Sequence, residues 1–178
     1  STSKITDLSI NWIKKQTKPW FLWVAYNAPH EPFHLPPSDL HKQGNLPTDP
    51  TSVSLNPLPY YLAMVEAMDK EMGRMFNSID DQTFENTIII FLGDNGTPSE
   101  VVQTFNTKRA KGSLYQGGIN VPMVISGKGV SRKNEEDNSL LNTTDLFSTI
   151  CEIAGAECPE RDDSKSFNKL LSGSFHDV

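Results

Sequence analysis

The sequence lacks several features that define common classes of protein. No apolar run is long enough to span a bilayer, so no transmembrane segment is predicted. The formal net charge is −6, and no basic patch or arginine-rich run appears, which argues against a nucleic-acid partner. Residues 1–20 are amphipathic and have no small-residue cleavage site, so they do not resemble a signal peptide.

Cysteine is also scarce, with Cys151 and Cys158 the only two in 178 residues. They are not spaced as a metal-binding pair, and they could form a disulfide or stay as two free thiols. Charged residues make up 21% and hydrophobic residues 37%, which indicates a globular chain. The length suits one domain, no internal repeat occurs, and residues 158–178 form a polar tail.

The most informative stretch that is present covers residues 86–96 (NTIIIFLGDNG). Its short, β-branched apolar run, 88–92, predicts a strand buried on both faces, as in a parallel sheet. Asp94 and Asn95 follow, and ligands of open α/β sheets bind beyond the carboxyl ends of strands. Their hard oxygen donors suit Ca²⁺ or Mg²⁺ better than zinc. An ordinary turn is the alternative, because Asp-Asn-Gly is also common turn chemistry.

The rest of the chain alternates helical and extended patterns, which predicts an α/β layer fold. Few strands are predicted, so the sheet looks incomplete for a free-standing domain. The predicted elements are a helix capped by Thr6 and running to Ile13, a buried strand 20–26, a long helix 61–79, a strand 122–126, and a helix that starts at Thr144 or Asp145 and ends at Gly155.

Two loops carry further polar residues. His30 lies between Pro29 and Pro32, just after the predicted strand 20–26, and it opens the proline-rich loop 31–59, which we expect to face a substrate. Lys111 lies in a polar segment ahead of the strand 122–126. Each of these residues alone is typical of an ordinary solvated loop. Together with Asp94 and Asn95, they offer an imidazole, two metal ligands and a cation, a set that suits a sulfate or phosphate ester.

Taken in order, five segments resemble the C-terminal part of the catalytic domain of formylglycine-dependent sulfatases, in the alkaline-phosphatase-like superfamily. The resemblance covers about residues 6–156, most of the chain. The segments are 21–32 (FLWVAYNAPHEP), 61–73 (YLAMVEAMDKEMG), 87–96 (TIIIFLGDNG), 111–122 (KGSLYQGGINVP) and 144–155 (TDLFSTICEIAG).

The resemblance implies an α/β fold with an alkaline-phosphatase-like layered sheet and flanking helices, incomplete because an N-terminal portion is absent. It implies that Asp94 and Asn95 bind Ca²⁺, with Mg²⁺ as the alternative, and that His30 and Lys111 contact the sulfate as catalytic and substrate-binding residues. The implied substrate is a sulfated small molecule or glycan, and the implied location is periplasmic or extracellular.

The chain departs from the family pattern in one serious respect. The family's formylglycine nucleophile arises from Cys/Ser-x-Pro-x-Arg, which occurs nowhere here, and the family's early Asp-Asp ligands and Lys-x-His pair are also missing. Cys158-Pro-Glu-Arg161 has the right letters in the wrong register. Gln116, Asn120 and Ser148 stand where the family usually has Glu, Arg and Pro.

We therefore expect part of a sulfatase, whose nucleophile lies in the missing N-terminal half. That half is also the expected protein partner of this chain. The 178 residues alone are expected to be inactive. Two alternatives stay open at this point. One is a phosphodiesterase or phosphonate hydrolase of the same superfamily. The other is a non-catalytic metal- or partner-binding domain derived from a sulfatase.

Overall fold

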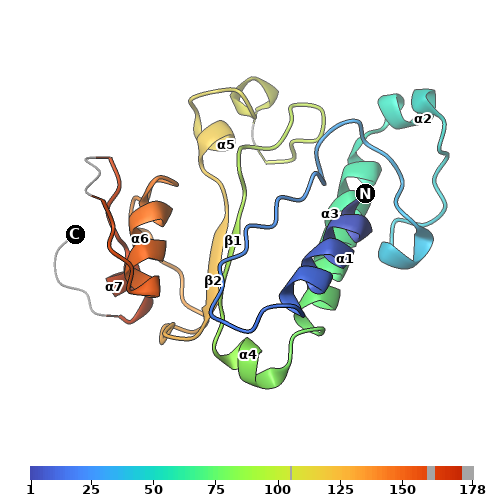
Figure 1. The fold of residues 1–178 in the computed structure, drawn as a ribbon. Helices are drawn as coiled ribbons and strands as arrows, with labels where there is room; N and C mark the ends of the chain where they lie inside the picture. Colours follow the sequence, from blue (N-terminus) through green and yellow to red (C-terminus); the bar gives the residue numbers. More distant parts are fainter. Residues whose placement is uncertain (105, 160–162, 174–178) are drawn as a thin grey trace. The chain divides into compact units, whose positions relative to one another are not determined.

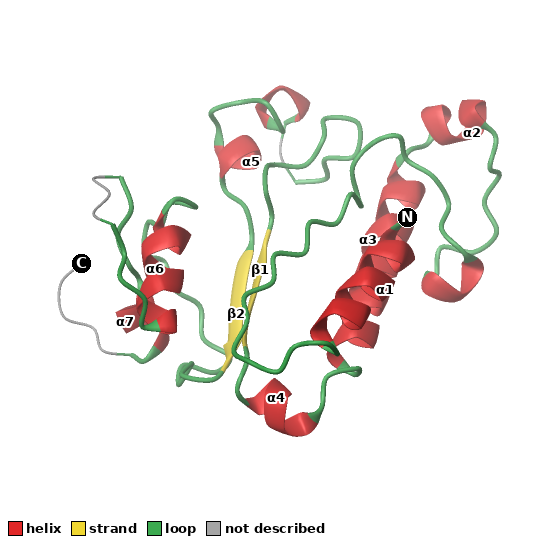
Figure 2. Cartoon of the chain, in the orientation of Figure 1, coloured by secondary structure: helices red, strands yellow, loops and turns green. Residues whose placement is uncertain are grey.

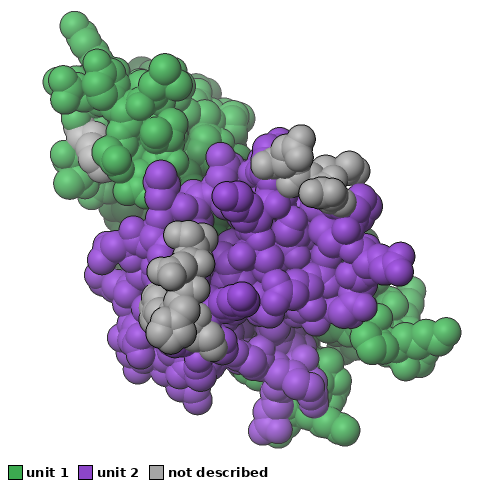
Figure 3. Space-filling view, turned by 90° about the vertical axis from the view of Figure 1, so that its left-hand side faces the viewer, with its two compact units in different colours: residues 1–84, 92–123 green, residues 85–91, 124–178 purple. Residues whose placement is uncertain are grey.

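The computed structural model describes residues 1–104, 106–159 and 163–173 of the chain. It divides into two compact units, which are described separately below (Figure 3). Unit 1 comprises residues 1–84 and 92–123, and unit 2 comprises residues 85–91 and 124–178. The chain passes from one unit to the other at three points, after residues 84, 91 and 123. Of the misregistered motif at 158–161, Glu160 and Arg161 lie outside the described residues.

Short helices and one strand pair make up the described elements (Figures 1 and 2). In chain order they are α1 (Thr2–Ile13), η1 (Ser38–Leu40), α2 (Pro50–Leu55), α3 (Leu58–Phe76), α4 (Asp81–Glu85), β1 (Ile88–Leu92), η2 (Thr107–Arg109), α5 (Gln116–Ile119), β2 (Met123–Gly127), α6 (Asp145–Ala154) and α7 (Asn168–Leu171). This mixed α/β content agrees with the fold class predicted from the sequence.

The core of unit 1 forms where α1 packs against α3. Ile10 and Ile13 of α1 are buried with Met75 of α3. The helix predicted over 61–79 is confirmed, although α3 runs from Leu58 to Phe76. Its buried positions are Tyr60, Ala63, Met64, Ala67, Glu71 and Met75.

Glu71 is the unexpected charge in this helix contact, because only 4% of its surface is exposed. Its carboxylate accepts a hydrogen bond of 2.6 Å from the Arg74 guanidinium, which also pairs with Asp7 of α1 at 2.8 Å. The hydrogen bonds that the guanidinium donates to Glu71 and Asp7 raise the pKa of Arg74 above its ordinary value. The buried carboxylate is therefore neutralised by an arginine that links both helices.

The predicted N-cap at Thr6 is wrong, because α1 begins at Thr2 with Ser1 at the cap position. Thr6 is fully buried within the helix. Its hydroxyl donates to the Thr2 carbonyl at 3.3 Å and lies 2.9 Å from the Tyr26 hydroxyl. The Thr6 hydroxyl is therefore hydrogen-bonded inside the helix, and it also links α1 to the segment that follows the helix.

The predicted strand 20–26 does not form in the structure, where this segment is extended but belongs to no sheet. Trp20, Leu22 and Val24 pack against the core of α1 and α3. The alternate side chains Phe21 and Trp23 are 61% and 66% exposed. The alternation of a strand is present, but a strand also needs a partner to accept its backbone hydrogen bonds, and no described segment supplies one.

The proline-rich loop after His30 is fixed along α3. Gln43 Nε2 donates to the Glu66 carboxylate at 2.7 Å, and the Tyr60 hydroxyl donates to the Pro47 carbonyl at 2.6 Å. The loop also contains η1 and α2, and Asp49 caps α2 by accepting from Ser52 N at 2.9 Å. These contacts give the loop a defined path over the helix.

β1 has the bounds predicted for it. β2 is shifted by one residue toward the C-terminus, because it covers Met123–Gly127 and not 122–126. The two strands pair as a two-stranded sheet. Gly93 N donates to Pro122 O at 2.9 Å and Lys128 N donates to Thr87 O at 3.0 Å. The end of one strand thus meets the start of the other, so the pair is antiparallel. The predicted parallel environment with both faces buried is wrong for this pair, since every residue of β1 is only half-buried.

The core of unit 2 joins α6 to α7. Leu146 of α6 and Phe167, Leu170 and Leu171 near α7 are buried. Part of the segment expected to be a polar tail therefore packs against α6. The helix α6 ends at Gly155, whose φ of 62° lies in the left-handed region, as the sequence predicted for a glycine C-cap.

Candidate functional site

The predicted metal ligands lie directly after β1. The strand ends at Leu92, Gly93 continues the pairing with Pro122, and the chain then bends at Asp94 and Asn95. Both side chains are exposed. Neither forms a hydrogen bond or ion pair with another residue in the described part of the chain. The carboxylate and carboxamide oxygens are therefore available to a ligand from solvent.

The segment that carries these two residues is joined to the lysine loop by backbone hydrogen bonds within unit 1. Gly96 N donates to Gly118 O at 3.1 Å, and Lys111 N donates to Thr97 O at 2.9 Å. Asp94 and Lys111 are 17 residues apart in sequence, yet each lies within a few residues of these bonds. The structure thus brings the tip that carries Asp94 and Asn95 together with the lysine loop, as a common site requires.

Glycine at positions 96 and 118 leaves room for this close packing of the backbones. A Cβ atom on Gly96 would lie 2.0 Å from the Gly117 carbonyl oxygen and 2.7 Å from the Gly118 Cα. A Cβ on Gly118 would lie 2.1 Å from the Ser113 carbonyl oxygen. From sequence alone, Gly117 and Gly118 are consistent with an ordinary turn. The recurrence of glycine in both motifs was the available signal for two backbones in contact.

Lys111 lies in a tight loop that ends at the short helix α5. Ala110, just before it, is buried, and the Ala110 carbonyl accepts hydrogen bonds from the backbone and the hydroxyl of Ser113, the latter at 2.7 Å. Gly112 has a φ of 82°, which turns the chain back. The Lys111 side chain is half-buried, and its ammonium group has no carboxylate partner in the described residues.

His30 lies at the start of the long loop, in a turn closed by its own N–H donating to the Asn27 carbonyl at 2.8 Å. Both flanking prolines follow cis peptide bonds. The ring is exposed, and Nδ1 lies 2.9 Å from the Glu31 carbonyl oxygen. Because a carbonyl can only accept, Nδ1 carries the proton, and Nε2 is left to face a substrate. No recorded contact joins His30 to Asp94 or Lys111.

The donor set at Asp94 and Asn95 fits a hard cation in chemistry but not in number. A Ca²⁺ ion takes about six to eight oxygens, and this pair offers two free oxygen-bearing side chains. Within the described ranges, no group of three or more His, Cys, Asp or Glu side chains could hold a metal ion. Further ligands would have to come from water, from the substrate, or from outside the chain.

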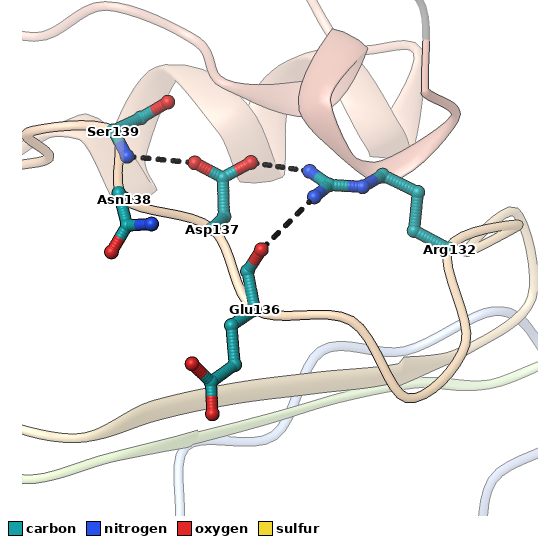
Figure 4. A pocket seen from close by; sticks show the side chains of 5 residues that line it. All are labelled: Arg132, Glu136, Asp137, Asn138 and Ser139. Atoms are coloured by element: carbon teal, nitrogen blue, oxygen red, sulfur yellow. Dashed lines mark hydrogen bonds and ion pairs between the residues drawn. The ribbon is translucent and has the colours of Figure 1, made fainter.

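Two hollows lined by described residues lie in unit 2. One lies beside Arg132, whose guanidinium pairs with Asp137 and reaches the Glu136 carbonyl at 3.3 Å (Figure 4). The other is lined by two residues of α6 and five that follow it: Ser148, Glu152, Ala156, Cys158, Pro159, Ser164 and Ser166. Neither is lined by a predicted site residue. Cys151 and Cys158 are both free thiols.

Comparison with known proteins identifies the family. A model of the Sulfatase family matches residues 1–156, which is most of the chain. The chain therefore belongs to the sulfatase family, and its fold is a part of the α/β fold of that family. This agrees with the resemblance drawn from the five sequence segments.

Named relatives carry the same description. A sulfatase of Formosa agariphila is 29% identical over 189 residues, covering 96% of this chain and 33% of its own length. An ulvan-active sulfatase of the same organism is 26% identical over 174 residues, covering 94% of this chain and 32% of its own length. The chain thus spans about a third of the length of these relatives.

A solved structure gives the same result. The protein Ps i-CgsB, crystallised in complex with k-i-k-neocarrahexaose, superposes with a TM-score of 0.78 at 26% identity. The match covers 94% of this chain and 37% of that protein.

In the part of the chain that the structure describes, no helix is long and apolar enough to cross a membrane.

Proposed function

We propose that this chain is the metal- and sulfate-binding part of a sulfatase that hydrolyses sulfate esters of carbohydrates. One observation carries the proposal. The Gly96–Gly118 and Thr97–Lys111 backbone bonds hold two free oxygen ligands and one cation in neighbouring loops. Membership of the sulfatase family, and relatives described as acting on ulvan or bound to a carrageenan oligosaccharide, support this choice of substrate.

Each side chain has a role that its position allows. Asp94 and Asn95 would hold a Ca²⁺ ion, or Mg²⁺ in its place, and the ion would neutralise charge on the sulfate oxygens. The Lys111 ammonium would bind a sulfate oxygen directly. At His30, the bond from Nδ1 to the Glu31 carbonyl leaves Nε2 to contact the sulfate or pass a proton to the leaving oxygen.

The nucleophile is not among these residues. We infer that a formylglycine residue, made from a Cys/Ser-x-Pro-x-Arg motif, lies in a part of the protein outside the 178 residues. The exposed Phe21 and Trp23 support a further part of the protein, because such neighbouring apolar side chains are usually covered. We propose that this part completes the sheet beside segment 20–26. An exported location, periplasmic or extracellular, stays a prediction that cell fractionation would test.

The test uses the full-length protein, meaning the natural protein that contains these 178 residues. Sulfate release from an aryl sulfate and from sulfated carbohydrate oligosaccharides is measured beside phosphate release from the matching phosphate esters. The proposal expects sulfate release to dominate. Dominant phosphate release would favour the phosphodiesterase or phosphonate hydrolase alternative. Release of neither ion would favour a non-catalytic, metal- or partner-binding domain derived from a sulfatase.

A further inference from the structure

The lysine loop carries a concentration of positive charge that the overall composition conceals. Residues 101–123 contain three cations, Lys108, Arg109 and Lys111, and no acidic residue, in a chain whose net charge is −6. The nearest preceding acid, Glu100, accepts a hydrogen bond from the Ser99 hydroxyl. The net charge of the whole chain therefore does not reveal this local cluster of cations. The proposed function uses only Lys111, so it does not explain Lys108 and Arg109.

The backbone of this loop is fixed by local hydrogen bonds. The Asn106 side chain accepts from Lys108 N at 2.9 Å, and the Asn106 carbonyl accepts from Arg109 N at 2.8 Å, which forms the single turn η2. Buried Ala110 and the bond from Lys111 N to Thr97 O hold the other end of the turn. Lys108 and Arg109 are nevertheless exposed. The loop therefore presents their charges from a fixed backbone.

Arg109 is the best-defined of these charges. Its guanidinium carbon lies 4.5 Å from the centre of the Tyr115 ring, which stacks the cation on an aromatic face. The ring itself is 54% exposed. Neither Lys108 nor Arg109 forms an ion pair with another described residue. A stacked guanidinium keeps the N–H donors on its edge free, in the fork that matches a sulfate or carboxylate.

Only Ala110 separates Arg109 from Lys111 in sequence, so their Cα atoms lie within about 7 Å of each other. We propose that Lys108, Arg109 and Tyr115 form an accessory subsite for a second anionic group of the substrate. The occupant is a sulfate or carboxylate on the same oligosaccharide whose scissile sulfate contacts Lys111. The subsite rests on the proposed function and narrows it, because it selects polyanionic glycans over esters with a single charge.

The test compares variants of the full-length protein on two substrates. One is a disulfated carrageenan oligosaccharide, and the other is an aryl sulfate with one charge. Arg109→Gln is expected to lower the ratio of kcat/KM for the oligosaccharide to kcat/KM for the aryl sulfate about tenfold, mainly through KM. Tyr115→Leu keeps the charge but removes the stacking, so a smaller fall of about threefold is expected. Lys14→Gln, at an exposed lysine after α1, is the control for lost charge and should leave the ratio unchanged.

A second measurement does not depend on catalysis. The same variants are eluted by salt from immobilised heparin, a polysulfated glycan. Arg109→Gln and Lys108→Gln should elute at lower salt than the wild type and Lys14→Gln. Equal elution of all four proteins, or equal kcat/KM ratios in Arg109→Gln and wild type, would overturn the subsite. If neither the wild type nor any variant hydrolyses the oligosaccharide or the aryl sulfate, the sulfatase proposal fails. The heparin result alone then decides whether the loop binds polyanions.

Discussion

At Gly96, the absence of a side chain lets two backbones pass within contact distance. The hydrogen bond from Gly96 N to Gly118 O holds the tip with Asp94 against the loop with Lys111. No flexible side chain lies between them that could move aside, because the atoms that a Cβ would meet belong to the backbone of Gly117 and Gly118. The geometry of the candidate site therefore depends on this residue, although it binds nothing itself.

We expect Gly96→Ala to destabilise the protein by about 2 kcal/mol or more, since the loops would have to separate to admit the methyl group. The matched control is Gly73→Ala in α3, where nothing lies within 4 Å of the added Cβ. It should be neutral or stabilise by up to about 1 kcal/mol. Urea unfolding of the full-length protein measures both, and equal stability of the two variants would contradict the close approach.

The site residues themselves differ in how far the sequence could define them. Asp94, Asn95 and Lys111 were assigned from their motifs, and the structure brings their loops together as one site requires. Their ligand and catalytic roles stay predictions. The bond from the His30 ring to the Glu31 carbonyl, which sets the proton on Nδ1, depends on the folded turn and could not be predicted from residue order.

Among the elements, α6 and the segment after it depend on one buried threonine. The Thr149 hydroxyl donates to the Asp145 carbonyl at 2.7 Å and accepts from Phe167 N at 3.0 Å. Thr149 is fully buried, and Phe167 is 2% exposed. This hydroxyl therefore satisfies a buried backbone N–H that has no other recorded partner.

Thr149→Val keeps the shape of the side chain but removes the acceptor. We expect a loss of about 1–3 kcal/mol in the free energy of unfolding, because the Phe167 N–H is left buried without a partner. Thr149→Ser retains the hydroxyl and should recover part of this loss. Chemical denaturation of the full-length protein gives both values. A valine variant as stable as the wild type would show that α6 does not hold the later segment in this way.

The loop between β2 and α6 contributes a pH-dependent element. Hydrogen bonds from Ser139, followed by the Arg132 guanidinium, lower the pKa of Asp137 to about 2 (Figure 4). The unfolded value is about 3.9, so the ionised carboxylate stabilises the fold above about pH 4. That contribution is lost as the pH falls through about 2.

Asp137→Asn should therefore weaken the dependence of stability on pH between about 4 and 2. Asp69→Asn, at an exposed position on α3, is the control and should keep the wild-type dependence. Unfolding free energies measured from pH 6 to 2 provide the comparison. Superimposable curves for Asp137→Asn and wild type would show that the pair with Arg132 does not stabilise the fold.

Local patterns defined some elements better than others. The apolar run at Ile88–Leu92 gave β1 its bounds, because a short β-branched segment followed by glycine has few alternative structures. The pattern at 20–26 was equally apolar, but a strand forms only beside a partner, and sequence pattern does not reveal whether one is present. The antiparallel pairing of β1 with β2 also follows from contacts between distant residues, not from either segment alone.

The whole chain has the sequence segments of a sulfatase but spans about a third of its named relatives. The family could be recognised from the sequence because five segments occur in order, each with its own spacing. What covers the exposed Phe21 and Trp23 could not be recognised from the sequence. Those side chains point away from the core of unit 1, so their environment is set by other parts of the protein.

We predict that the purified 178-residue chain releases no sulfate from an aryl sulfate, since it contains no nucleophile motif. It should also bind a hydrophobic dye through the side chains of segment 20–26. Replacing both Phe21 and Trp23 with Ser should reduce dye binding, whereas the same change at Leu55, which is 81% exposed in α2, should have less effect. Sulfate release by the isolated chain would refute the proposal that the nucleophile lies outside these 178 residues.

The most direct test of the central claim is sulfate release by the full-length protein beside its Asp94→Ala variant. Asp69→Ala serves as the control for loss of an exposed carboxylate. If Asp94 binds the metal ion, the wild type and the control should release sulfate from a sulfated oligosaccharide, and Asp94→Ala should release none above background. Near-wild-type sulfate release by a folded Asp94→Ala variant would contradict the assignment of the site.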